Sequence, residues 1–384
     1  MILVCDCAAA AALVWLLNMV ALIRFRRAKE AHWTERARRL YPARVAAVIS
    51  VWILPLDLAL GQQLAWPSLT PHWMLAALAA WVGAVAGTYP FEREVAPWLR
   101  PRTWLRTVFA NCIIRLTVWF VLLGIMILMP EQLDWRCGLL VVLFVGFYLG
   151  WCWGGLLRVS RKLGVLRPAP DRLCRVVAEV AGRMGVPVRG VWLLDLARSF
   201  AFALPYTGDL AFSARLLEQL TDEEVAAICA HEIGHLAESK LTVGTRVFVD
   251  LAWLVPWLFL NPAGRAFDGL GIGAIALGSF LTLFGARWFS RRLEKRADHA
   301  AHTNEGEAGT YARALARLYE DNLIPAVLPR RGRTHPDLYD RLLAVGVQPD
   351  FPRPAAASSN AIHGLLFCAL LGILLVLSLN RVYP

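Results

Sequence analysis

Eight long apolar runs constrain this chain more than any other feature of its sequence. They lie at roughly 3–23, 45–66, 72–89, 107–129, 137–157, 243–261, 269–288 and 361–379. A run of about 18 or more apolar residues is long enough to cross a bilayer as a helix. A buried helix of a large soluble protein explains one such run, but it explains eight together poorly. With 58% of the residues hydrophobic and only 18% charged, we expect a mainly α, polytopic membrane bundle of about eight helices.

The net charge of +11 is distributed unevenly between the connecting segments. Residues 24–44 and 90–106 are rich in arginine, whereas 67–71, 130–136 and 262–268 carry at most one basic residue each. This alternation follows the positive-inside rule. It predicts that the N-terminus lies outside and that the basic segments face the cytoplasm. The excess of positive charge is explained by the orientation of the helices in the membrane. We therefore expect membrane lipid as a partner and no nucleic acid.

The same rule places two long polar segments on the cytoplasmic face, where they can meet and form one domain. The predicted organisation is a five-helix membrane bundle at 1–157, a first catalytic half at 158–242, a membrane hairpin at 243–288, a second catalytic half at 289–360 and a last membrane helix at 361–384. The first run has no basic stretch before it and no small-residue cleavage site after it. It is therefore interpreted as a retained anchor.

Within the polar segments, the pattern predicts an α+β arrangement. We expect helices at 171–184 and near 336–345, and strands at 188–195, 199–204 and 210–213. Thr221 and Glu224 have the spacing of a capping box, which predicts a helix from Asp222 to about Lys240.

The segment His231-Glu232-Ile233-Gly234-His235 lies inside that helix. Residues four apart share a helix face, so the two imidazoles can reach one zinc ion. Glu232 lies beside the first ligand, where it can act as general base on a metal-bound water. A pair of packed histidines without metal is the structural alternative.

A catalytic zinc takes three protein ligands and keeps one position open. Glu294, just after the seventh apolar run and on the same predicted face, is the candidate third ligand. Asp298 lies four residues further along the same helix face. It can accept a hydrogen bond from the far nitrogen of a ligating histidine and so fix its orientation. The alternative for Glu294 is a surface carboxylate paired with nearby arginines.

The chain resembles the integral-membrane gluzincin peptidases, a family that includes the type I CAAX prenyl protease and HtpX. The resemblance covers roughly residues 170–345 and rests on His231-Glu232-x-x-His235, on Glu294-x-x-x-Asp298, and on Thr334-His335-Pro336 followed by Arg341. It implies one zinc ion, a zincin-like catalytic domain and endopeptidase activity. It also implies that His335 and Arg341 lie near the scissile carbonyl, where they would stabilise the oxyanion.

A further segment, Phe200-Ala201-Phe202-Ala203, resembles the family's edge strand that pairs with the substrate backbone. The family usually has asparagine where Phe200 stands, and this departure leaves the local loop geometry in doubt. The leading membrane runs resemble the prenyl protease more than HtpX, while the eighth run departs from both.

Two other functions remain open at this point. Asp57, Arg115 and Asp250 lie within apolar runs, as in transporters, and the zinc fold can also serve a sensor or scaffold without turnover. The main expectation is a metalloendopeptidase that cuts a protein or peptide, possibly membrane-bound, with its site facing the cytoplasm. The Ala-, Arg- and Leu-rich composition hints at a bacterial inner membrane, and the sequence does not name the substrate.

Overall fold

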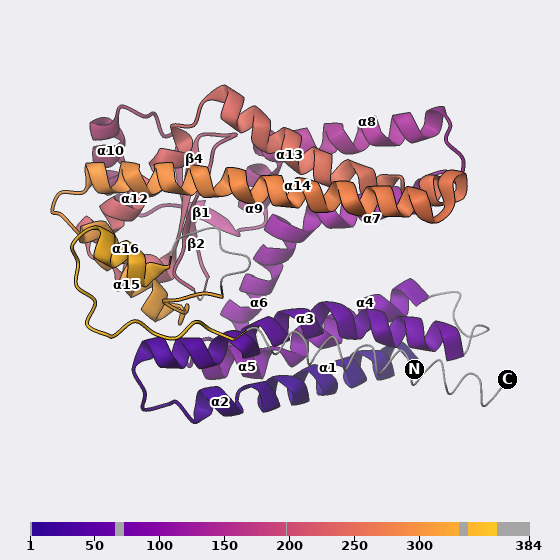
Figure 1. Ribbon diagram of the computed structural model, residues 1–384, viewed down its shortest axis with the longest axis horizontal. Helices are drawn as coiled ribbons and strands as arrows, with labels where there is room; N and C mark the ends of the chain where they lie inside the picture. The colour runs from indigo at the N-terminus through magenta and orange to yellow at the C-terminus, as the bar shows by residue number, and fades with distance from the viewer. Residues whose placement is uncertain (1, 66–72, 197, 330–336, 359–384) are drawn as a thin grey trace.

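A computed structural model describes residues 2–65, 73–196, 198–329 and 337–358 of the chain. Figure 1 shows long helices in two layers, with a small sheet and its helices at one end of the second layer. Mainly helical structure with a small α/β part agrees with the predicted fold class.

The first layer is built by the N-terminal helices. Its helices are α1 (Ile2–Ala21), α2 (Ile23–Arg26), α3 (Trp33–Ala65), α4 (Trp73–Gly87) and α5 (Tyr89–Val95). Helices α1, α3 and α4 pack against one another. The buried contact between α1 and α4 includes Ala10, Ala80 and Ala84. Such small side chains let membrane helices approach closely.

The second layer contains the remaining apolar helices. Its elements are α6 (Pro101–Asn111), the π-helical turn η2 (Cys112–Leu116), α7 (Thr117–Leu128), α8 (Trp135–Gly150), the π-helical turn η3 (Trp151–Gly155), α9 (Leu156–Lys162), α13 (Lys240–Leu258) and α14 (Leu260–Asn304). Helix α14 has 45 residues and one kink, at Asp268. In Figure 1 it runs from the far end of the layer into the α/β part. The predicted boundary at residue 288 therefore falls inside a continuous helix.

The predicted number of about eight membrane helices is confirmed only in part. Within the described residues, five helical stretches are long and apolar enough to cross a membrane: Leu3–Arg26, Pro101–Leu128, Trp135–Lys162, Lys240–Leu258 and Leu260–Asn304. Of the run at 72–89, residues 73–87 form helix α4, and the residues just before it lie outside the described part of the chain. The run at 361–379 lies outside the described residues, so the count of eight is not confirmed.

A four-stranded mixed sheet has the order β1-β2-β4-β3. Its strands are β1 (Leu166–Pro168), β2 (Gly190–Leu194), β3 (Ala201–Leu204) and β4 (Asp209–Ser213). Strand β2 is parallel to β4, while β3 runs antiparallel to β4 and forms one edge. Three of these strands match the predicted segments, and β1 was not predicted.

Five helices accompany the sheet. They are α10 (Asp171–Met184), α11 (Ala214–Gln219), α12 (Asp222–Leu236), α15 (Thr310–Asp321) and α16 (Leu338–Ala344). Helix α10 buries Leu173, Val177 and Val180, an i, i+4, i+7 pattern, against the core that α12 shares. Helix α12 starts at the capping box predicted from Thr221 and Glu224. It ends at Leu236, four residues before the predicted end.

Candidate metal centre

Helix α12 carries His231, Glu232 and His235 at its buried C-terminal half. Both histidine rings project from one face of the helix, with their centroids 5.1 Å apart. The ring atoms that point away from the helix are the Nε2 atoms, and both face the same carboxylate. This is the arrangement expected from the i, i+4 spacing.

That carboxylate belongs to Glu294 on α14. Its Oε2 atom lies 3.6 Å from His231 Nε2 and 3.7 Å from His235 Nε2. One ligand atom from each of the three residues falls within 4.8 Å of the others. Two ligands of a tetrahedral zinc, each about 2.0–2.1 Å from the ion, lie roughly 3.3 Å apart. The three donors therefore fit zinc with only small shifts of their side chains.

Close contact between α12 and α14 brings Glu294 to the histidines. Gly234 faces α14, and a Cβ atom added there would lie 3.1 Å from the Cα of Ala297 and 3.1 Å from the Cβ of Ala300. Real Cβ contacts are rarely so short, so a side chain at this position would push the helices apart. The glycine within the motif thus has a packing role between the two halves of the site.

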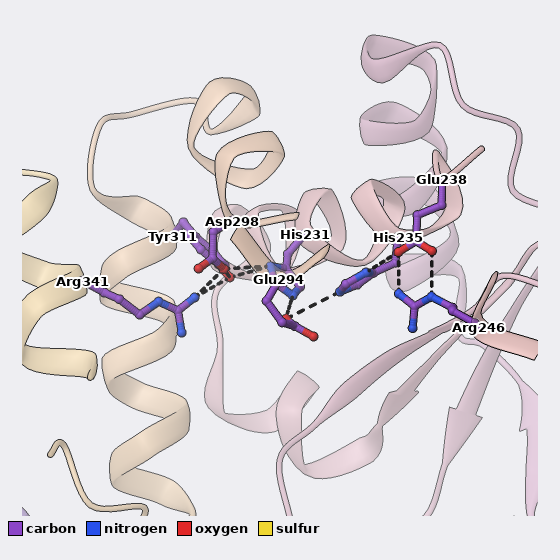
Figure 2. Close-up of polar contacts among 8 residues, drawn as sticks. All are labelled: His231, His235, Glu238, Arg246, Glu294, Asp298, Tyr311 and Arg341. Atoms are coloured by element: carbon purple, nitrogen blue, oxygen red, sulfur yellow. Dashed lines mark hydrogen bonds and ion pairs between the residues drawn. The ribbon is translucent and has the colours of Figure 1, made fainter. Parts of the chain in front are cut away.

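On one side of the centre, a hydrogen-bonded group holds the far nitrogen of His231 (Figure 2). His231 Nδ1 lies 2.7 Å from the Tyr311 hydroxyl and 3.2 Å from Asp298 Oδ1. Tyr311 donates to Asp298 at 2.8 Å, and Arg341 Nη2 donates to both Asp298 and Tyr311, at 2.5 and 3.0 Å. Because the hydroxyl has one proton, which goes to Asp298, it accepts from His231. This assigns the proton to Nδ1 and leaves Nε2 free for a metal.

On the other side, His235 Nδ1 lies 3.0 Å from Glu238 Oε1. Arg246 of α13 donates two hydrogen bonds to this carboxylate, at 2.5 and 2.8 Å. The Glu238 side chain is only 1% exposed. Figure 2 shows the whole row of side chains from Arg341 to Arg246, with Glu294 between the two histidines. Each histidine thus presents Nε2 to the centre and gives Nδ1 to an oxygen partner.

The centre is strongly acidic, and this favours a cation. Burial alone would lower the pKa of the His231 imidazole, but its bonds to Asp298 and Glu294 raise that pKa to about 9. Burial likewise opposes the charge on His235, while Glu238 and Glu294 raise its pKa to about 9. Burial raises the pKa of Glu232 above its usual range. A site that holds protons this tightly also attracts a divalent metal.

The predicted substrate segment lies beside the centre. Strand β3 is an edge strand, and the backbone of Ala203 lies near the Glu232 carboxyl, where it favours the charged form and so opposes the effect of burial on that pKa. Phe200 and Ser213 are paired through a backbone hydrogen bond of 2.9 Å. Alternation along an antiparallel pair then directs the backbone groups of Ala201 and Ala203 to the free edge.

The structure brings together most of the residues that the sequence singled out. His231, Glu232, His235, Glu294, Asp298 and Arg341 meet at one place. Arg341, which is 9% exposed, lies behind Asp298 and contacts it together with Tyr311. His335 lies outside the described residues. The sequence reasoning missed Tyr311, Glu238 and Arg246.

Residues 169–346 match peptidase family M48. This match contains all six residues that meet at the centre. Residues 169–346, somewhat less than half of the chain, thus form a domain similar to the M48 zinc metallopeptidases. The enzyme class is therefore that of a metalloprotease, a hydrolase of peptide bonds.

Several M48 relatives share the name protease HtpX. The protein from Chromohalobacter salexigens is 29% identical over 251 residues, which cover 54% of this chain and 81% of that protein. The protein from Pseudomonas aeruginosa is 30% identical over 175 residues, covering 41% and 60%. An HtpX homolog from Thermoplasma acidophilum is 29% identical over 194 residues, covering 47% and 61%. The chain thus spans about three fifths of the length of the last two relatives.

Proposed function

We propose that this protein is a zinc-dependent endopeptidase that cuts membrane-associated protein or peptide substrates at the cytoplasmic face. The observation that carries the proposal is that one ligand atom each of His231, His235 and Glu294 lie within 4.8 Å of one another, with both Nε2 atoms 3.6–3.7 Å from Glu294 Oε2. Two imidazoles and one carboxylate with an open side are the ligand set of a catalytic zinc site. One ion per chain is expected. When bound, zinc acidifies a water molecule and polarises the peptide carbonyl.

In this mechanism, Glu232 handles the proton. It lies next to the metal-ligand face and is buried, with 8% of its surface exposed. Burial raises the pKa of its carboxyl, which suits a group that accepts a proton from water and passes it to the leaving amine. The carboxylate lies near the backbone of Ala203, which favours its charged form, so the base stands beside the edge strand.

Substrate is proposed to bind as an added strand along β3. The outward backbone groups of Ala201 and Ala203 would pair with the peptide, and the Phe200 and Phe202 side chains would contact its side chains. Because Ala203 lies next to Glu232, a peptide in this position passes directly over the metal ligands. Extended substrates are favoured by this geometry, since pairing requires a strand.

His335 is proposed to stabilise the oxyanion that forms at the scissile carbonyl, as the family resemblance implies. Arg341 is proposed to act differently from the sequence expectation. Its guanidinium is bound to Asp298 and Tyr311, so it orients the partners of His231. Of the two residues, His335 alone is then proposed to contact the oxyanion.

The cytoplasmic location is supported by the basic segment 24–44. Arg44 of this segment donates to the backbone carbonyls of Asn322 and Leu323, at 2.6 and 2.9 Å, which places the segment at the same end of the molecule as the metal centre. By the positive-inside rule this end faces the cytoplasm. The alternative of transport gains no support, because Asp250 is bound to Tyr148 at 2.6 Å and the Asp57 side chain lies outside the described residues.

A matched pair of variants tests the proposal. Glu232→Gln should retain one zinc per chain, because Glu232 is not a ligand, but cleavage should fall by about 10²–10⁴-fold because the base is lost. Glu294→Ala should lose both zinc and cleavage. Metal content is measured by elemental analysis, and cleavage with an unfolded protein substrate in detergent. Wild-type cleavage by Glu232→Gln would refute the mechanism, and zinc without cleavage in the wild type would favour a sensor or scaffold.

A further inference from the structure

A second cavity lies away from the metal centre, between the N-terminal helices and the α/β part. Its volume is about 900 Å³. Its walls come from the end of α2 and the residues after it, from α5, and from α11 and α15. Five basic and three acidic side chains line it. This cavity takes no part in the proposed peptide hydrolysis.

Three of the basic side chains are already neutralised by carboxylates. Arg26 binds Glu94 with two hydrogen bonds of 2.6 Å. Arg215 binds Asp321 at 2.6 Å, and Arg317 binds Glu224 at 2.8 Å. These pairs fix the walls of the cavity.

Lys29 and Arg36 are different, because neither has a carboxylate partner among the residues that the structure describes. The Nε atom of Arg36 is buried and has no hydrogen-bond partner. Its guanidinium carbon lies 5.7 Å from the centre of the Phe25 ring. A buried donor without an acceptor is costly. An acceptor that enters the cavity would remove that cost.

The cavity also lies at a defined depth in the membrane protein. Phe25 and Arg26 line it, and they are the last residues of Leu3–Arg26, the first stretch that is long and apolar enough to cross a membrane. This is the level of the lipid headgroups. Arginine binds phosphate through a planar set of donors, and lysine binds it as a point charge. Glu320 is the one lining carboxylate that no basic partner is seen to neutralise, and it leaves the remaining charge positive.

We propose that this cavity is a binding site for a phosphate-bearing anion, held by Lys29 and Arg36. Occupation would connect the N-terminal helices with α15, because Arg36 lies on α3 and Arg317 of α15 also lines the cavity. Helix α15 also carries Tyr311 at the metal centre. The proposal does not depend on the peptidase mechanism, since the cavity shares no residue with it.

The test uses the full-length, zinc-loaded protein in a neutral detergent, with inorganic phosphate as the probe. Phosphate should raise the Tm in a saturable manner. Lys29→Gln/Arg36→Gln should weaken binding by at least about tenfold, since it removes two charge-assisted contacts. The control is Arg24→Gln/Arg27→Gln, which changes the net charge equally on exposed residues of the same segment that do not line the cavity. It should bind phosphate as the wild type does.

A second arm distinguishes a lipid headgroup from a free phosphate compound. The same proteins are placed in nanodiscs of phosphatidylglycerol or of phosphatidylcholine. A higher Tm in phosphatidylglycerol that depends on Lys29 and Arg36 identifies the headgroup as the source. Binding of inorganic phosphate without this lipid preference identifies a soluble phosphate compound.

Two results would overturn the proposal. One is the absence of a saturable effect in both arms, and the other is an equal loss of binding in the two double variants, which would show a diffuse charge effect. Should Lys29→Gln/Arg36→Gln fail to fold, the single variant Lys29→Gln, at an exposed side chain, replaces it. It should weaken phosphate binding by at least about threefold, since it removes one charge-assisted contact; a smaller loss in a folded sample also overturns the proposal.

Discussion

The two histidines of the metal centre are supported in opposite ways. His231 is held by Asp298, Tyr311 and Arg341, which come from three helices far along the chain. His235 is held by Glu238 and, through it, by Arg246, which both follow within the next turn and helix. One side therefore depends on the assembled fold, while the other depends on the local path between α12 and α13.

The chemistry of the two sides differs as well. The His231 side buries its arginine, with Arg341 only 9% exposed at the side chain. Arg246 on the His235 side is 29% exposed, so it can reach water or lipid headgroups if its partner is lost. We therefore expect substitutions on the His231 side to cost more stability and zinc affinity than those on the His235 side. Three substitutions test this order.

The largest effect is expected for Asp298→Asn. It leaves Arg341 buried without a negative partner, which costs about 3–5 kcal/mol of the free energy of unfolding. It also removes the carboxylate beside His231, so zinc affinity should fall by about 10–100-fold. Stability is measured by unfolding in mixed micelles, and affinity by competition with a chelator.

Adding Arg341→Met to Asp298→Asn separates the two losses. The double variant should regain much of the stability, because no buried charge is left unpaired, but it should not regain zinc affinity. If both properties recover together, Asp298 acts only through Arg341, and the proposed support of His231 is wrong.

A smaller effect is expected for Glu238→Gln. The amide still contacts His235, and Arg246 can turn toward solvent, so the free energy of unfolding should fall by about 1–3 kcal/mol. Zinc affinity should fall by about tenfold. A loss as large as that of Asp298→Asn in the same assays would show that the two sides are equally strong.

The smallest effect is expected for Tyr311→Phe. The ring still packs on His231, whose ring centroid lies 5.6 Å away, and Asp298 Oδ1, 3.2 Å from Nδ1, can accept its proton in place of the hydroxyl. We expect a loss of about 1 kcal/mol in the free energy of unfolding and less than a tenfold change in zinc affinity. Loss of zinc from this variant would mean that the hydroxyl, and not Asp298, sets the orientation of His231.

The same contrast explains what the sequence could predict. His231 and His235 follow from helical spacing, and Glu294 and Asp298 follow from the same spacing on a second helix. Glu238 was within reach, because a helix continued to Lys240 places it three residues after His235. Tyr311 was not, because its position depends on how α15 packs against α12, and no local pattern records that contact.

Some helix bounds could likewise be predicted from the sequence, and others could not. The capping box gave the start of α12, and the apolar period gave α10 from Asp171 to Met184. The continuity of α14 was missed because its composition changes from apolar to charged near residue 289. Its backbone has no reason to stop there, since neither glycine nor proline occurs between Ala286 and Asn304.

The continuity of α14 limits how the length of its membrane portion can change without moving Glu294. Because α14 is unbroken beyond Asp268, the rotational phase of its membrane portion fixes the direction in which Glu294 points. Each residue of an α-helix turns the following part by about 100°, so a single insertion in the span would swing Glu294 and Asp298 away from the histidines. A seven-residue insertion completes nearly two turns and restores the phase to within about 20°. The length of α14 must therefore match the thickness of the bilayer and also point Glu294 toward the histidines. Only insertions or deletions of nearly whole numbers of turns meet both requirements.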